Sequence, residues 1–238
     1  NNAKEHWLVL NQEHYLMALQ QTKEIEVYDK CRFFIEPEAK GTLAAIICPI
    51  AHARDEIFLI SSSDHWIPDT ESFQKSLGHA LDLTQNDHIV CFGIKPDHAS
   101  DQYGYFEMID DKIHRFYEKP NTAKAADFLN KGYYWNAGVF MLRSSTLKQA
   151  CKELNISYPK HENNVLEQVV LLKKEDYKLI PKDSFDYAIL EKVTNLKAVA
   201  CDFSWSDLGS YKSLEKYIDS HGIRNIWQDK SENNEVIA

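Results

Sequence analysis

The chain has 238 residues, of which 44% are hydrophobic and 26% charged, a composition typical of a globular protein with a sizeable core. Its formal net charge of −9 argues against a general nucleic-acid binder, and no apolar run is long enough to span a membrane. The five cysteines are scattered without a Cys-x-x-Cys pair, and the ten histidines form no metal-binding motif. We therefore expect reduced cysteines in a cytoplasmic protein.

Strand and helix patterns alternate through the first hundred residues. Short apolar runs predict strands at Trp7–Leu10, Phe33–Ile35, Ile57–Ile60 and Ile89–Ile94. Helical spacings lie between these runs, and one of them begins near Asp69. This alternation predicts an α/β fold with a mostly parallel sheet flanked by helices. The run Ile57–Ile60 is expected to be buried on both faces.

The pattern changes after residue 100. Two strand-like segments on either side of Asp110-Asp111-Lys112 predict an inserted hairpin. The further predicted elements are a helix at Thr122–Lys131, a strand at Tyr134–Leu142, a helix after Ser144, helices at Val165–Lys174 and Ser184–Lys192, a strand at Lys197–Ala200 and a helix at Tyr211–Ile218. We expect one domain over residues 1–218, a linker over 219–238 toward a C-terminal region, and further sequence before residue 1.

Two carboxylates stand next to predicted strands. Asp64 follows three serines at the end of one strand, and Asp207 lies between a later strand and a helix. Ligands of open α/β sheets bind beyond the carboxyl ends of the strands. Mg²⁺ is held by one or two carboxylates together with substrate phosphates and water, so the pair predicts such a site. The structural alternatives are a turn cap for Asp64 and a helix N-cap for Asp207.

A second group of residues would suit a phosphorylated sugar. Lys119 could contact a phosphate as a point charge, and Glu118 beside it could accept hydrogen bonds from hydroxyl groups. Asn136 is unusual in the middle of a strand, and Gly138 leaves space on the same face. The alternatives are a solvated lysine and an asparagine bonded to backbone.

The turn from Glu36 to Thr42 could recognise a base. Backbone N–H groups at a helix start, here at Gly41 and Thr42, bind anions or base edges. A carboxylate accepts two adjacent donors, which guanine presents and adenine, uracil and thymine do not. If a base binds here, Glu36 favours guanine; otherwise Glu36 lies on a surface turn before Pro37.

Eight short motifs occur in the order found in one known family. They are Glu36-Pro37 with Gly41-Thr42, Ser63-Asp64-His65, Phe92-Gly93-Ile94-Lys95-Pro96, Tyr103-Gly104-Tyr105, Phe116-Tyr117-Glu118-Lys119-Pro120, Tyr134-Trp135-Asn136-Ala137-Gly138, Ser184-Phe185-Asp186-Tyr187 through Glu191-Lys192, and Trp205-Ser206-Asp207-Leu208-Gly209. Over about residues 5–218 the chain thus resembles the sugar-1-phosphate nucleotidyltransferases, in particular the mannose-1-phosphate guanylyltransferase branch. That family's N-terminal glycine-rich loop, and the strand that carries it, have no counterpart in this chain.

The resemblance implies a Rossmann-like nucleotide-diphospho-sugar transferase fold and transfer of GMP from GTP to mannose 1-phosphate, giving GDP-mannose and pyrophosphate. The resemblance implies Mg²⁺ as the cofactor and a role in polysaccharide biosynthesis. It also implies a homodimer as one form of assembly. Without the loop, the chain is expected to bind GTP poorly. The implied catalytic residues are Asp64, Lys119 and Asp207, with Asp64 and Asp207 as metal ligands; the nucleotide contacts are Glu36, Pro37, Gly41, Thr42, Ser63 and His65; and the mannose contacts are Gly104, Tyr105, Glu118, Asn136, Gly138, Asp186 and Lys192.

Two alternatives to this function remain open. One is a non-catalytic subunit that senses a GDP-sugar, and the other is a nucleotidyltransferase for a different hexose 1-phosphate. Neither nucleic acid nor a membrane is expected as a partner.

Overall fold

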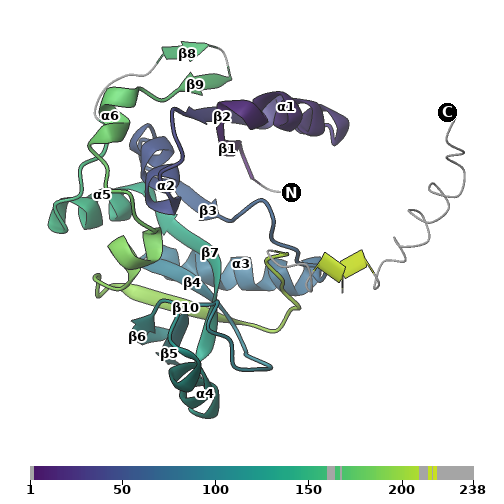
Figure 1. Ribbon diagram of the computed structural model, residues 1–238, viewed down its shortest axis with the longest axis vertical. Helices are drawn as coiled ribbons and strands as arrows, with labels where there is room; N and C mark the ends of the chain where they lie inside the picture. Colours follow the sequence, from purple (N-terminus) through teal and green to yellow (C-terminus); the bar gives the residue numbers. More distant parts are fainter. Residues whose placement is uncertain (1–2, 160–163, 167, 209–213, 216, 219–238) are drawn as a thin grey trace, which may run out of the picture.

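The computed structural model describes residues 3–159, 164–166, 168–208, 214–215 and 217–218 (Figure 1). Strands and helices alternate through much of the chain. In chain order the elements are β1 (His6–Asn11), η1 (Gln12–His14), α1 (Tyr15–Glu24), η2 (Tyr28–Lys30), β2 (Cys31–Glu36), α2 (Thr42–Ala51), β3 (Ile57–Ile60), α3 (Thr70–Thr84), β4 (Ile89–Ile94), β5 (Tyr105–Ile109), β6 (Lys112–Tyr117), α4 (Thr122–Asn130), β7 (Tyr134–Arg143), α5 (Ser144–Glu153), β8 (Asn164–Leu166), β9 (Val169–Leu171), α6 (Lys174–Lys178), η3 (Asp186–Leu190) and β10 (Leu196–Cys201).

The strands form two sheets. The smaller sheet has the order β1-β2-β9-β8, in which β1, β2 and β9 are parallel. The larger sheet has the order β3-β7-β4-β10-β6-β5, in which β4 and β10 are parallel. Strand β7 lies antiparallel between β3 and β4, so these two run in the same direction without being neighbours. The predicted α/β fold with parallel strands is confirmed, and β7 and the inserted hairpin add the antiparallel pairs.

Strand β4 separates the two main layers of the core. All six of its residues are buried, and successive side chains point to opposite faces of the sheet. Ile89 and Cys91 face one hydrophobic cluster, which includes residues of α2 and α5. Val90 and Phe92 face the other, which includes residues of α3 and α4. Helices therefore cover both faces of the larger sheet, as Figure 1 shows.

Two predictions about individual elements are wrong. The strand β3 is not buried on both faces, and Leu59 is 44% exposed, because β3 is the edge of its sheet and pairs only with β7 among the described strands. The segment Val165–Lys174 is not a helix: it contains β9, which extends the smaller sheet beside β2. Its valines are β-branched and suit a strand, although their spacing also fits a helix.

The segment predicted as a helix at Ser184–Lys192 contains a short π-helix, η3, a type that is rare and occurs often at functional sites. The predicted hairpin turns at Asp110 and Asp111, which both have positive φ. In the predicted last helix Leu214, Glu215, Tyr217 and Ile218 are helical, whereas Tyr211 and the predicted linker lie outside the described residues. No described helix is long and apolar enough to cross a membrane.

A bulge in β7 interrupts its pairing with β4. Cys91 lies opposite Phe140, but Gly93, two residues further along β4, lies opposite Asn136. Strand β7 therefore carries two extra residues over this interval, and Gly138 within it has φ +65°, a conformation that glycine adopts without strain. Bulges of this kind redirect side chains, and this one stands beside Asn136.

Candidate active site

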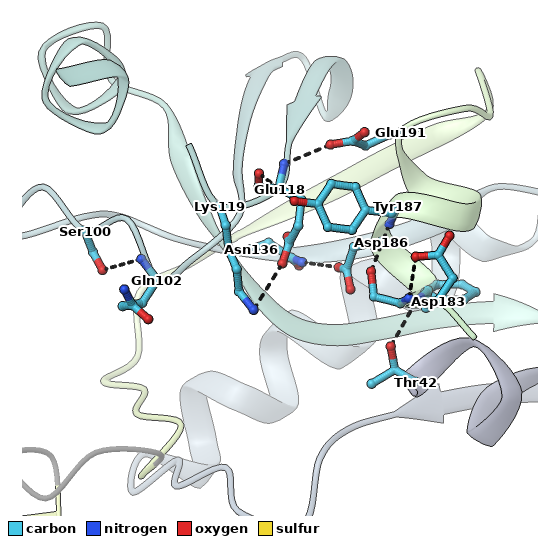
Figure 2. Close-up of polar contacts among 12 residues, drawn as sticks. Thr42, Ser100, Gln102, Glu118, Lys119, Asn136, Asp183, Asp186, Tyr187 and Glu191 are labelled. Carbon is cyan, nitrogen blue, oxygen red and sulfur yellow. Dashed lines mark hydrogen bonds and ion pairs between the residues drawn. The ribbon is translucent and has the colours of Figure 1, made fainter. Parts of the chain in front are cut away.

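Four of the predicted sugar-binding residues come together from separate parts of the chain. Figure 2 shows three of them, Glu118, Asn136 and Asp186. The Asn136 amide nitrogen donates to Asp186 Oδ1 at 2.8 Å, and the Asn136 backbone N–H donates to the Gly104 carbonyl at 2.8 Å. A Cβ atom at Gly104 would lie 2.6 Å from Glu118 Oε2 and 3.3 Å from Asn136 Cβ. Because Gly104 has no side chain, the Glu118 carboxylate can lie beside Asn136 without a steric clash.

Lys119 supplies a cation at the edge of this cluster. Its Nζ lies 3.8 Å from Glu118 Oε1, and its side chain is 58% exposed, whereas that of Glu118 is 9% exposed. Figure 2 shows the Lys119 side chain directed toward the Glu118 carboxylate. The arrangement offers hydrogen-bond acceptors inside and one positive charge outside, which suits a neutral sugar that carries a phosphate.

Burial raises the pKa values of the carboxyl groups in the cluster, and repulsion between the carboxylates adds to the rise at Glu118. Burial, followed by the negative charge of Asp186, raises the pKa of Glu118 from 4.5 to about 7, although Lys119 opposes the shift. Burial also raises the pKa of Asp186, and hydrogen bonds from its own backbone N–H and from Asn136 oppose that change. Carboxyl groups with raised pKa values in one cluster are typical of functional sites.

The two candidate metal ligands, Asp64 and Asp207, lie on segments that pair with each other. Trp66 and Ser206 form an isolated antiparallel bridge, with N···O distances of 2.8 and 3.1 Å. Burial lowers the pKa of His65, while the charges of both Asp64 and Asp207 act on its ring in the opposite direction. Two carboxylates near one imidazole suit a cation that takes its other ligands from substrate and water. No group of three or more His, Cys, Asp or Glu side chains suited to a metal occurs in the described part of the chain.

The sugar cluster and the carboxylate pair are neighbours because two segments contribute to both. The Tyr103 hydroxyl donates to Asp207 Oδ1 at 3.4 Å, and the next residue, Gly104, borders Glu118. On β7, Asn136 belongs to the sugar cluster, whereas a Cβ at Gly138 would lie 3.2 Å from the His65 ring. Because Asn136 and Gly138 are two residues apart on β7, the two clusters are neighbours.

The predicted nucleotide turn lies against the segment that carries Asp186. A Cβ at Gly41, where φ is +93°, would lie 2.5 Å from the Asp183 carbonyl oxygen, and the Thr42 hydroxyl accepts from the Phe185 N–H at 2.9 Å. Glu36 accepts a short hydrogen bond from the Tyr177 hydroxyl, which lowers the Glu36 pKa against a larger rise caused by burial. The roles of Glu36, Gly41 and Thr42 in binding guanine stay predictions.

The structure places the remaining predicted residues as follows. Tyr105 is fully buried in the core and its hydroxyl accepts from the Ser100 N–H, so its side chain packs away from the cluster that Gly104 borders. Its contact with mannose stays a prediction. The space predicted beside Gly138 is occupied by the His65 ring. Lys192 is exposed and has no described side-chain bond to the cluster, while Pro37 and Ser63 lie on exposed turns.

Sequence reasoning did not assign roles to several residues that shape the site. Glu191 Oε1 accepts from the Glu118 N–H at 3.0 Å, and the Tyr187 hydroxyl donates to the Glu118 carbonyl at 3.4 Å. Both residues occur in the quoted motif Ser184 to Lys192, which was the available signal. Tyr177 carried no signal, because nothing in the sequence pairs it with Glu36, 141 positions away.

Comparisons with known proteins identify the family of the chain. The Nucleotidyl transferase family matches residues 1–221. The chain is 31% identical to mannose-1-phosphate guanylyltransferase RfbM of Salmonella typhimurium, over 94% of this chain and 51% of that protein. It is 30% identical to the xanthan biosynthesis protein XanB of Xanthomonas campestris, over 92% of this chain and 50% of that protein. The chain thus spans about half the length of these relatives.

Among solved structures, the fold resembles a Helicobacter pylori protein described as mannose-6-phosphate isomerase. The TM-score is 0.79 and the identity 26%, over 86% of this chain and 85% of that one. The family match covers nearly the whole chain, including every part of the site described above. The chain belongs to the nucleotidyl transferase family.

Proposed function

We propose that this chain is the catalytic part of an enzyme that transfers GMP from GTP to mannose 1-phosphate, giving GDP-mannose and pyrophosphate. The observation that carries the proposal is the convergence of Glu118, Asn136 and Asp186 beside the ammonium of Lys119. Three side chains suited to hydroxyl groups and one suited to a phosphate match a hexose 1-phosphate. The name of the Salmonella relative supports GMP as the transferred group and mannose 1-phosphate as its acceptor.

Each side chain has a role in this scheme. Glu118, Asn136 and Asp186 hold the hydroxyls of mannose, and Lys119 holds the phosphate. Asp64 and Asp207 hold Mg²⁺, which when bound neutralises charge on the triphosphate. Glu36 and the turn at Thr42 contact the guanine base. The five cysteines are free and buried, which suits an enzyme of the cytoplasm.

The chemistry needs positioning more than proton transfer. The attacking oxygen belongs to a phosphate that is already anionic, so it forms the new bond to the α-phosphorus of GTP as the bond to pyrophosphate breaks, without a strong general base. The contribution of the protein is to align the two substrates and to stabilise the charge that develops on the transferred group.

The proposal is tested by measuring pyrophosphate release by the full-length protein. GTP, UTP and dTTP are each combined with mannose 1-phosphate and with glucose 1-phosphate, and mannose 6-phosphate isomerisation is assayed in parallel. We expect the GTP and mannose 1-phosphate pair to exceed every other pair by at least about tenfold. We expect Lys119→Gln to lower turnover about a hundredfold, and Lys124→Gln, at an exposed position of α4, to leave it near wild type.

Two outcomes would overturn the proposal. Binding of GDP-mannose without pyrophosphate release would indicate the sensing subunit. A preference for another sugar phosphate would indicate a different transferase.

A further inference from the structure

The backbone of Lys119 has an unusual conformation for its place in the sequence. Its φ is +41°, in the left-handed region that residues with a side chain rarely adopt. The next residue is Pro120, which favours an extended conformation in the residue before it. Two independent preferences therefore oppose this conformation, and such strain persists only where the surrounding structure holds it.

Both polar backbone groups of the preceding residue, Glu118, are held from one segment. The Glu118 N–H donates to Glu191 Oε1 at 3.0 Å, and the Glu118 carbonyl accepts from the Tyr187 hydroxyl at 3.4 Å. Tyr187 lies in η3, and Glu191 follows it directly. Figure 2 shows these two side chains approaching the Glu118 backbone from the side opposite to the Lys119 ammonium.

We propose that Glu191 is a positioning residue, which fixes the Glu118 peptide so that Lys119 keeps its left-handed backbone and its ammonium stays at the sugar cluster. The proposal rests on the role of Lys119 proposed above. Because η3 also carries Asp186, the same segment then positions the hydroxyl-binding and the phosphate-binding sides of the site. What Glu191 supplies is an acceptor oxygen at a defined place.

The proposal predicts different effects for two substitutions of Glu191. Glu191→Gln keeps an Oε1 acceptor and loses the charge, whereas Glu191→Ala loses both. We expect Glu191→Ala to raise KM for mannose 1-phosphate about tenfold while KM for GTP changes less than about twofold, and Glu191→Gln to stay within about threefold of wild type for both. Glu153→Ala, which removes an exposed glutamate on α5, is the control and should change neither constant. Equal effects of Ala and Gln, or equal rises in both KM values, would overturn the proposal.

A second measurement needs no substrate and follows the strain itself. Glycine adopts positive φ freely, so Lys119→Gly removes the strain that Glu191 is proposed to hold. We expect Glu191→Ala to lower the folding equilibrium constant about threefold or less in the wild-type background, because release of the strain at Lys119 offsets the lost hydrogen bond. In the Lys119→Gly background no strain is released, and we expect a loss of about tenfold, by urea unfolding. Equal losses in the two backgrounds would refute the coupling.

The two experiments distinguish failure of this inference from failure of the proposed function. If the full-length protein releases no pyrophosphate from GTP and mannose 1-phosphate, the proposed function fails, and the unfolding cycle alone decides whether Glu191 positions Lys119. If the protein is active and the unfolding cycle shows no coupling, the inference fails and the function stands.

Discussion

The stability of this protein should depend on pH through Glu118. Its side chain is 9% exposed, and burial together with the charge of Asp186 raises its pKa from 4.5 to about 7. Between these values the native state binds the proton more tightly than the unfolded state, so the free energy of unfolding falls as pH rises through the window. At ~1.36 kcal/mol per pKa unit the full shift is worth about 3 kcal/mol, of which about 2.5 kcal/mol is lost between pH 5 and pH 8.

The perturbation that isolates this contribution is Glu118→Gln, which keeps the size of the side chain and cannot ionise. We expect the variant to gain about 2.5 kcal/mol over wild type between pH 5 and pH 8 in urea unfolding, which corresponds to roughly 5–10 °C in melting temperature. Taking the difference between variant and wild type at each pH cancels the titration of groups that do not interact with Glu118. Glu153→Gln on the exposed face of α5 is the control and should change stability by less than about 0.5 kcal/mol. A variant-minus-wild-type difference that is the same at pH 5 and pH 8 would refute the reasoning.

Three further predictions concern activity and packing. Asp207→Asn in the full-length protein should lower turnover at least about a hundredfold in a pyrophosphate-release assay, and a near-normal rate would exclude Asp207 as a metal ligand. Gly104→Ala places a methyl group 2.6 Å from Glu118 Oε2 and should raise KM for mannose 1-phosphate about tenfold. Gly78→Ala, in open space on α3, is the matched control, and equal KM values for the two variants would contradict the close contact. Gly41→Asn must adopt φ +93° with a Cβ 2.5 Å from the Asp183 carbonyl oxygen, so it should cost about 2–3 kcal/mol of stability, and an unchanged melting temperature would show that the turn relaxes freely.

Much of the site could be predicted because its residues lie where strands end. Asp64 follows β3, and Glu118 follows β6, and each is in a short motif with a polar residue at the strand end. The order of such motifs along the chain was enough to group residues as far apart as Asn136 and Asp186. The α/β pattern could be predicted for the same reason, since the first four strands are separated by helical spacings.

The rest could not be predicted because it depends on which elements meet. The sequence of β7 does not state that it lies antiparallel between β3 and β4, and an edge position left β3 half exposed despite its apolar run. The spacing in Val165–Lys174 fits a helix and a strand equally well, and pairing with β2 decided for the strand. Tyr105 was predicted together with Gly104 because they share a motif, although the Tyr105 side chain is fully buried in the core.

The bulge at Gly138 makes the site dependent on strand register. Ahead of it Asn136 meets Asp186, and behind it Phe140 returns to regular pairing with Cys91. A side chain at Gly138 would both strain φ and press on His65, and the simplest relief is for β7 to slip along β4. Such a slip would move Asn136 away from Asp186 and would also disturb the turn that carries His65. The proposed sugar and metal sites would then be disturbed together, so this one glycine links the two proposed sites.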